Sequence, residues 1–312
     1  MSNLEICFNA VAPIFLLIAY GYLAKMLGVI KREQVASINK IVFACFLSVT
    51  LFYNIYSSDL SASFSVPLLV YGLFALAAEI LLGFLYTARF VPDRSRKGVM
   101  IQAFFRSNTA VLGLPLARSL YPDADLGSFS ILMAVLIPLY NILGVVLMEM
   151  YRGEQLDLRD TLKSIAKNPL IIGSLLGVFC SLLKVKFPYV IEKALSNAAG
   201  VSSPLLLFLL GAFFDVKTTA EHRRELIAGT LARLLVCPGI LLTLAALLGF
   251  RNVEFVALLS VLTSSAAVAT FSVAQQMGGD ADLSGNLIVT TGALCSFTIF
   301  LWSFIFKSLG IF

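Results

Sequence analysis

The tetrapeptide Asp-Ala-Asp-Leu occurs twice in this chain, at residues 123–126 and again at residues 280–283. At the same offset of 157 residues, the Ser-Asn-Thr-Ala-Val run at 107–111 falls on the Ser-Ser-Ala-Ala-Val run at 264–268. Weaker matches continue in the same order through most of the chain, and this shared order carries the inference. We therefore predict a duplicated unit, with its first copy in residues 1–157 and its second in residues 158–312.

The composition places the duplicated unit in a membrane. Hydrophobic residues make up 59% of the chain and charged residues only 13%, with a mean hydropathy of +0.92, whereas a soluble domain is about half apolar and one-quarter charged. A spanning helix requires about 20 mostly apolar residues. Ten segments meet this requirement, five in each copy: 6–28, 38–56, 66–88, 98–120, 127–150, 168–186, 195–214, 226–249, 253–277 and 284–306. Residues 187–200 could instead form a separate amphipathic helix at the interface.

The odd number of crossings per copy sets the relative orientation of the copies. Five crossings turn the second copy upside down relative to the first, and such an inverted repeat is common among secondary transporters. Fifteen Lys and Arg residues fall in one set of alternate loops and six in the other, and the positive-inside rule assigns the richer set to the cytoplasm. We therefore expect an all-α, multi-pass protein of the cell membrane with both termini extracytoplasmic. The net charge of +5 reflects this bias and indicates no nucleic-acid partner.

The fourth segment contains the strongest signal for a broken helix. Gly113 and Pro115 interrupt it directly after the polar run Ser107-Asn108-Thr109. Proline removes a backbone donor, glycine permits unusual dihedral angles, and lipid cannot satisfy the backbone groups that are released. We predict an interruption near residues 109–113. A simple proline kink, with the polar residues joining neighbouring helices, is the alternative.

The ninth segment is the predicted partner of the fourth. Its residues 262–270 are small or weakly polar and include Ser264 and Ser265, and small side chains let another backbone approach closely. We expect an interruption at residues 264–268 and an X-shaped crossing of the two segments near the midplane. Because this segment lacks Pro and Gly, a continuous helix remains open.

Cysteine and histidine give no signal for a metal site or a disulfide. The five Cys residues lie in or beside apolar segments without Cys-x-x-Cys spacing, so they are interpreted as small hydrophobic residues. His222, the single histidine, lies in a charged loop and is interpreted as a solvated side chain. The apolar segments contain no catalytic dyad and no nucleophile with a base. We expect no enzyme activity, no cofactor and no metal.

The run from Asn108 through Gly113-Leu-Pro115-Leu, together with Pro138 and Asn141-Ile-Leu, resembles the fourth and fifth helices of the auxin efflux carrier family. That family includes plant PIN-type carriers and bacterial malonate or malate carriers. Asn168-Pro169 is similar to the opening of the family's sixth helix. The chain departs from the family where Ser265 and Thr270 stand at the ninth-helix crossover and Ser48 stands in the second helix, since the family usually has Pro at both places.

The resemblance implies a fold similar to bile-acid symporters and sodium/proton antiporters. In that fold a scaffold domain, here 6–56 with 168–214, supports a transport domain, here 66–150 with 226–306. Crossings 4 and 9 cross at the site. Sodium-coupled relatives carry a carboxylate in the ninth helix, but no charged residue lies between Glu254 and Asp280. Sodium coupling is therefore less favoured than proton coupling, although backbone carbonyls with Ser107, Asn108 and Ser130 could hold a cation.

Away from the segment ends, three charged residues fall inside apolar segments: Glu79, Arg106 and Arg233. A charge at the bilayer centre costs at least about 2.5–3.5 kcal/mol on insertion scales, so each needs a partner or a function. The repeat offset places Glu79 and Arg233 within a helical turn of equivalent positions, which allows a structural ion pair. Alternatively, Glu79 carries protons. Arg106 could attract an anion to the polar run or extend toward the cytoplasmic face.

These patterns predict an elevator-type secondary transporter of small organic anions, meaning mono- or dicarboxylates and auxin-like acids. Asn108 is the first candidate for binding a carboxylate, supported by Thr109, Arg106, Ser264, Ser265 and Asn141. Glu79 is the candidate for ion coupling, and Gly113 and Pro115 mark the crossover. The expected partners are the substrate, the bilayer and a second copy joined through scaffold helices. A small-molecule membrane receptor that does not transport is the alternative.

Overall fold

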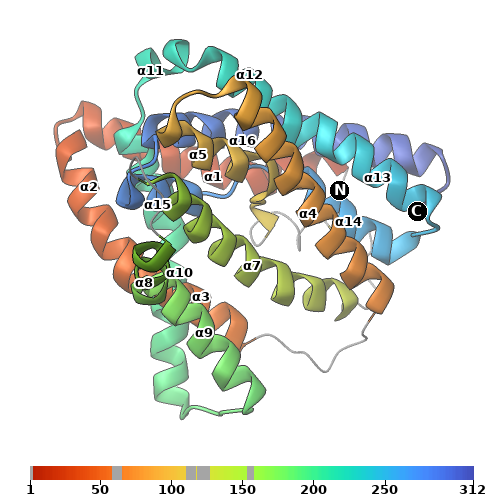
Figure 1. Cartoon of the computed structure of the whole chain (residues 1–312), viewed down its shortest axis with the longest axis horizontal. Helices are drawn as coiled ribbons and strands as arrows, with labels where there is room; N and C mark the ends of the chain where they lie inside the picture. The colour runs from red at the N-terminus through yellow and green to blue at the C-terminus, as the bar shows by residue number, and fades with distance from the viewer. Residues whose placement is uncertain (1–2, 58–64, 110–116, 118–126, 153–157) are drawn as a thin grey trace.

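The computed structural model describes residues 3–57, 65–109, 117, 127–152 and 158–312. Regular structure in these ranges is helical, apart from one isolated bridge between Ser107 and Ala266 (Figure 1). The helices are α1 (Asn3–Met26), α2 (Arg32–Ile41), η1 (Val42–Leu47), α3 (Ser48–Tyr56), α4 (Val66–Phe90), α5 (Arg94–Phe105), α7 (Gly127–Tyr151), α8 (Leu158–Lys167), α9 (Pro169–Leu182), α10 (Tyr189–Phe213), α11 (Val216–Glu221), α12 (Arg223–Leu231), η2 (Ala232–Val236), α13 (Cys237–Leu247), α14 (Asn252–Thr263), α15 (Ala269–Met277) and α16 (Ala281–Ser308).

Six of the described helices are long and apolar enough to cross a membrane. They are Arg32–Tyr56, Val66–Phe90, Gly127–Tyr151, Tyr189–Phe213, Arg223–Leu247 and Ala281–Ser308. Three shorter apolar helices accompany them: Ala12–Met26, Pro169–Leu182 and Asn252–Thr263. The expectation of an all-helical membrane protein is therefore confirmed. α10 runs unbroken from Tyr189 to Phe213, so the alternative of a separate interface helix at residues 187–200 was wrong.

Side chains fix several helix starts as the sequence would suggest. Asn168 accepts a hydrogen bond from the backbone of Leu170 at 2.9 Å, and Pro169 occupies the first helical position of α9. Asp280 caps α16 in the same way through Leu283 at 2.9 Å. Both devices satisfy amide groups that the first turn of a helix leaves free.

Helices α1, α3, α9 and α10 form one closely packed group, seen around α3, α9 and α10 in Figure 1. Glycines permit the contact: a Cβ on Gly211 of α10 would lie 1.9 Å from the backbone oxygen of Ile18 on α1, and one on Gly173 of α9 would lie 2.5 Å from that of Ser48. Backbones this close leave no room for a side chain. Small residues produce the same close packing in membrane helix pairs generally.

A second group contains α4, α5, α7 and the helices from α12 to α16. Its buried contacts include a hydrogen bond from the indole of Trp302 to the backbone oxygen of Leu234 at 2.9 Å. The rings of Phe255 and Phe306 lie 4.8 Å apart. Inside this group, α5 and α14 end within the bundle, and the segments that follow them cross.

Two continuous helices contain π-helical turns, η1 and η2. η1 lies directly before Ser48, where the resembled family usually has Pro, and the Ser48 hydroxyl donates to the backbone oxygen of Ala44 at 3.0 Å. η2 contains Arg233. A π-turn leaves backbone groups outside the regular ladder and often marks a functional position.

Candidate functional site

Two interrupted helices cross at the centre of the second group. α5 ends at Phe105 and α14 ends at Thr263, and the segments that follow them run antiparallel. The backbone amide of Asn108 donates to the oxygen of Ser265 at 2.9 Å, and the amide of Ala267 donates to the oxygen of Arg106 at 3.0 Å. Each broken helix thereby satisfies backbone groups of the other, which is required where lipid cannot.

The crossing corrects one boundary and resolves one open question. The first interruption begins at Arg106, before the expected position at Thr109, because the carbonyl of Arg106 and the amide of Asn108 bond across the crossing instead of along the helix. Gly113 and Pro115, the predicted breakers, lie outside the described residues. The second interruption, at residues 264–268, confirms the predicted position without Pro or Gly.

Arg233 lies against the carboxyl ends of both broken helices. Its guanidinium donates to the backbone oxygens of Phe104, Val261 and Ser264, each at 2.9 Å. It also forms an ion pair with Glu79 at 3.2 Å, and both side chains are at most 1% exposed. The last carbonyls of a helix carry partial negative charge, so Arg233 stabilises two helix ends at once.

The contact between Glu79 and Arg233 is the structural ion pair allowed by the sequence. Arg233 explains how α14 ends without a breaker residue, because its guanidinium donates hydrogen bonds to the carbonyl oxygens that the broken helix exposes. The sequence predicted that Arg233 lies within a helical turn of the position equivalent to Glu79. It did not predict that Arg233 binds the ends of two helices.

Arg106 is the second fully buried arginine, at 1% exposed, and its surroundings differ. One terminal nitrogen donates to the side-chain oxygen of Gln102 at 2.7 Å and the other to that of Asn141 at 2.6 Å. Both partners are neutral amides. Among the described residues, no carboxylate forms an ion pair with Arg106, so its charge has no compensating charge there.

Arg106 faces a small hollow of about 100 Å³ beside the crossing. Ser107, Asn108 and Asn141 also line it, and Thr50, Asn54 and Ser203 line it from α3 and α10. A larger cavity of about 500 Å³ adjoins it and shares Thr50, Asn54, Ile137 and Ser203 as lining residues. The cavity is therefore bounded by both helix groups, with the cationic end at the crossing.

The structure brings together most of the predicted site residues. Arg106, Asn108 and Asn141 line the small hollow, and Thr109 lines the larger cavity. Ser264 and Ser265 are buried behind the crossing, where the Ser264 hydroxyl donates to the backbone of Ser260 at 2.6 Å and Ser265 contributes its backbone oxygen. Their hydroxyl groups do not line either hollow.

The polar residues on α3 and α10 were missed in the sequence. Thr50 and Asn54 are four residues apart on one helix, and Ser196 and Ser203 are seven apart on the other, so each pair shares a helix face. All four line the larger cavity. The signal was present as polar pairs at helical spacing in apolar segments. Gln102, the partner of Arg106, was missed because an isolated amide near a helix end has no distinctive pattern.

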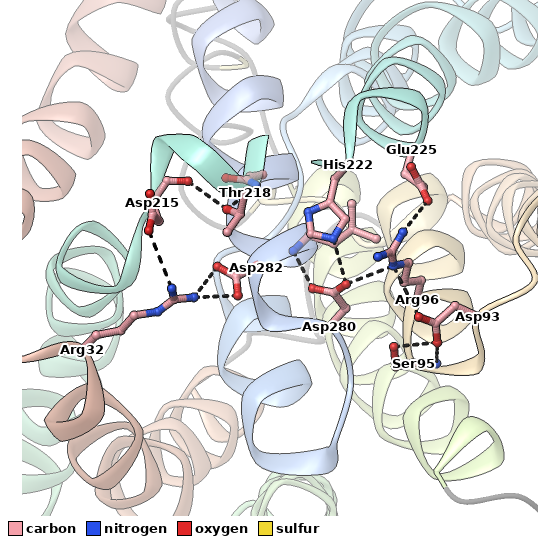
Figure 2. Close-up of polar contacts among 12 residues, drawn as sticks. Arg32, Asp93, Ser95, Arg96, Asp215, Thr218, His222, Glu225, Asp280 and Asp282 are labelled. Carbon is pink, nitrogen blue, oxygen red and sulfur yellow. Dashed lines mark hydrogen bonds and ion pairs between the residues drawn. The ribbon is translucent and has the colours of Figure 1, made fainter. Parts of the chain in front are cut away.

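A polar network closes the opposite end of the molecule (Figure 2). The guanidinium of Arg32 at the start of α2 pairs with the carboxylate of Asp282 on α16, and donates to its Oδ2 at 2.6 Å. Beyond the residues drawn in that view, Asn39 donates to Gln275 on α15 at 2.7 Å. The hydroxyl of Ser272 on α15 donates to Asn39 at 2.6 Å. α2, η1 and α3 form one continuous helix, and a rise of about 1.5 Å per residue places Arg32 roughly 30 Å from the cavity end of α3.

The same end holds a cluster centred on Asp280. His222 lies 3.0 Å from its carboxylate and Arg96 lies 3.2 Å from it (Figure 2). His222 is 4% exposed, so its interpretation as a solvated side chain was wrong, because Asp280 holds the imidazole inside. A hydrogen bond from Ser95 lowers the pKa of Asp93, and Arg96 adds to the effect.

Interrupted helices that cross beside a polar cavity, within a bundle of long apolar helices, define a multi-pass membrane transport protein. Residues 6–303 match the family described as membrane transport protein, and the chain belongs to that family, the auxin efflux carriers that its motifs resemble. It is 24% identical to an uncharacterised transporter of Methanocaldococcus jannaschii over 95% of this chain and 98% of the relative. It is 22% identical to an uncharacterised transporter of Methanothermobacter thermautotrophicus over 95% and 97%.

Proposed function

We propose that the protein is a secondary transporter of small organic anions, with mono- or dicarboxylates, including auxin-like acids, as its substrate class. The observation that carries the proposal is Arg106, a buried guanidinium that faces a polar hollow with only neutral amides as described partners. A buried charge without a counter-charge is costly. A bound carboxylate would supply that counter-charge, and guanidinium geometry suits a carboxylate.

Asn108 and Asn141 are the proposed polar partners of the substrate beside Arg106, and Thr109 supports them from the larger cavity. Ser264 and Ser265 are assigned to the crossing, where they hold its backbone. The apolar part of the substrate would lie in the larger cavity, whose lining includes Phe129, Met133 and Pro138.

We propose ten crossings arranged as a 5+5 inverted repeat. The hydrogen bond between Asn108 and Ser265 supports this arrangement, because the 157-residue offset makes these two positions equivalent. In a two-fold related pair, equivalent positions meet near the axis. Residues 6–56 and 168–214 would form the scaffold domain, and residues 66–150 and 226–306 the transport domain.

The proposed mechanism is an elevator-type exchange of access. The cavity lies between the proposed scaffold (α3, α10) and the proposed transport domain (α7 and the crossing), while Arg32, Asn39 and their partners join the two at the other end. If the loops richer in Lys and Arg lie in the cytoplasm, the cavity lies near the extracytoplasmic ends of the helices, and both termini are extracytoplasmic. Movement of the transport domain relative to the scaffold would close the cavity at this end of the molecule and open it at the other.

Coupling and assembly complete the proposal. We favour proton over sodium coupling, because no carboxylate lies between Glu254 at the start of the ninth segment and Asp280 beyond its end. We retain Glu79 as the candidate proton carrier in competition with its role as partner of Arg233. A homodimer would form through scaffold helices such as α1 and α9, which expose Leu16, Leu23 and Phe179. An enzymatic role is not proposed.

Counterflow in proteoliposomes tests transport directly. Vesicles loaded with unlabelled benzoate or malonate should accumulate the labelled acid transiently, because only a carrier exchanges one for the other. Binding without counterflow would favour the alternative of a non-transporting receptor.

Asn108→Ala tests the assignment of the site. It should weaken benzoate or malonate affinity about tenfold or more, because a hydrogen bond to a charged group contributes about 1.5–3 kcal/mol. Asn286→Ala is the matched control, since Asn286 is also buried but bonds to Thr218 and Thr219 away from the cavity. Equal affinity in the Asn108→Ala variant and the wild type would remove Asn108 from the site.

A further inference from the structure

The guanidinium of Arg106 is held by groups that direct it without neutralising it. Gln102 lies one turn earlier on α5, and Asn141 approaches from α7. Gln102 is itself 0% exposed, and its nitrogen donates to the backbone of Gly98 at 3.3 Å, which fixes its oxygen toward Arg106. A Cβ at Gly144 would lie 2.9 Å from Arg106 and 2.8 Å from Gln102, so the absence of a side chain there leaves space for both.

Comparison with Arg233 shows that only one of the two buried arginines has solely neutral side-chain partners among the described residues. Arg233 has the carboxylate of Glu79 and three helix carbonyls. The amides of Gln102 and Asn141 offer Arg106 the same kind of oxygen acceptor without a full negative charge. Glutamate and aspartate have nearly the same shapes as these amides and would supply that charge.

We propose that Gln102 and Asn141 determine the charge selectivity of the site, because two neutral acceptors position Arg106 and leave its charge for an anion. Gln102 is a positioning residue, since it does not line the hollow. The proposal rests on the proposed function for the identity of the anion. The state of Arg106 in the empty protein can be measured independently.

Gln102→Glu is the central variant. It should place a carboxylate at the present 2.7 Å contact and pair it with Arg106, so that a substrate anion must compete with a fixed one. We expect the affinity for benzoate and for malonate to fall about a hundredfold or more. In the ligand-free protein, pairing the buried guanidinium should raise the melting temperature by several degrees.

The measurement is a thermal-shift titration of the purified protein with benzoate and malonate, against benzamide and malonamide as neutral counterparts. Asn141→Asp places the carboxylate on the other partner and serves if Gln102→Glu does not fold. Gln276→Glu is the matched control, because it makes the same chemical change on α15, where Gln276 donates to the backbone of Ala36. It should neither raise the ligand-free melting temperature nor reduce the response to benzoate.

A ligand-free melting temperature that rises in Gln102→Glu, with loss of the response to both acids, would support the proposal. If the wild-type protein responds to neither acid but the ligand-free melting temperature still rises in Gln102→Glu, the result would count against the proposed function. It would still support the inference that the charge of Arg106 has no counter-charge in the empty protein. No rise in Gln102→Glu and in Asn141→Asp would overturn the inference whatever the substrate. A rise with an unchanged response to benzoate would overturn the role in selectivity.

Discussion

Two buried arginines lie beside the same helix crossing, and their partners assign them different roles. Arg233 binds a carboxylate and the carbonyl ends of α5 and α14, so it is part of the structure that lets both helices stop in the membrane. Arg106 binds two amides and faces the cavity. The same residue type therefore stabilises the helix ends at one position and leaves an uncompensated charge at the other.

Glu79→Gln separates the structural role of Glu79 from its role in coupling. The change leaves Arg233 buried without its carboxylate, at a cost of about 3–5 kcal/mol, so the melting temperature, exchange and net uptake should all fall together. Adding Arg233→Gln should recover part of the stability, because the unpaired charge is gone. The opposite pattern, with normal stability and exchange but no pH-driven accumulation, would make Glu79 a proton carrier.

At the scale of helices, the sequence predicted what depends on local chemistry. The apolar runs predicted the long helices, and the fourth segment predicted an interruption near residues 109–113, a few residues after α5 stops at Phe105. The break between α14 and α15 could not be decided locally, because its causes are distant: Arg233, the crossing strand, and Thr291, whose hydroxyl accepts from the amide of Ala266 at 3.1 Å. Small residues permitted that break, but only tertiary contacts produce it.

The contacts of α2 with α15 and α16 predict a closed gate that must open during transport. Ser272 is fully buried where α15 meets Asn39, so a cysteine at position 272, with the five native cysteines replaced, should react with a thiol reagent only when the helices separate. Asp282→Asn removes the ion pair with Arg32. Both partners are about one-third exposed, and such pairs contribute up to about 1 kcal/mol, so the reaction rate should rise up to about fivefold.

Glu149→Gln is the control for this measurement, because it removes the ion pair between the last turn of α7 and Arg152 directly after it, which joins no second helix. It should leave the reactivity of the cysteine at position 272 unchanged. If the Ser272→Cys protein reacted with the thiol reagent at the same rate with and without Asp282→Asn, and with and without benzoate, the result would argue against separation of these helices.

For the whole molecule, composition was sufficient to predict the membrane and the helical class, and the motifs were sufficient to predict the family. The cavity was predicted only in part, because its far wall comes from polar residues on α3 and α10 that are distant in sequence from the crossing. Packing of two helix groups decides which polar faces meet. No local pattern in either half contains that information.

The buried charges of the proposed transport domain predict how the membrane potential acts on transport. Among the described residues, Glu79 and Arg233 cancel, so the empty domain would carry the single positive charge of Arg106, and a bound monoanion would neutralise it. Moving one charge through the full field corresponds to about 2.3 kcal/mol per 100 mV. A potential that is negative inside should therefore hinder outward return of the empty domain, slow net uptake of benzoate and accelerate its net efflux.

Exchange of benzoate for benzoate involves only the loaded, neutral domain, so it should be nearly independent of voltage. Exchange of malonate, carried as a dianion, leaves one negative charge on the moving domain and should respond to voltage. Potassium diffusion potentials in proteoliposomes, with tracer exchange and net flux measured on the same vesicles, make the comparison. If benzoate exchange and benzoate net flux depended on voltage to the same degree, Arg106 could not be the charge that the substrate neutralises.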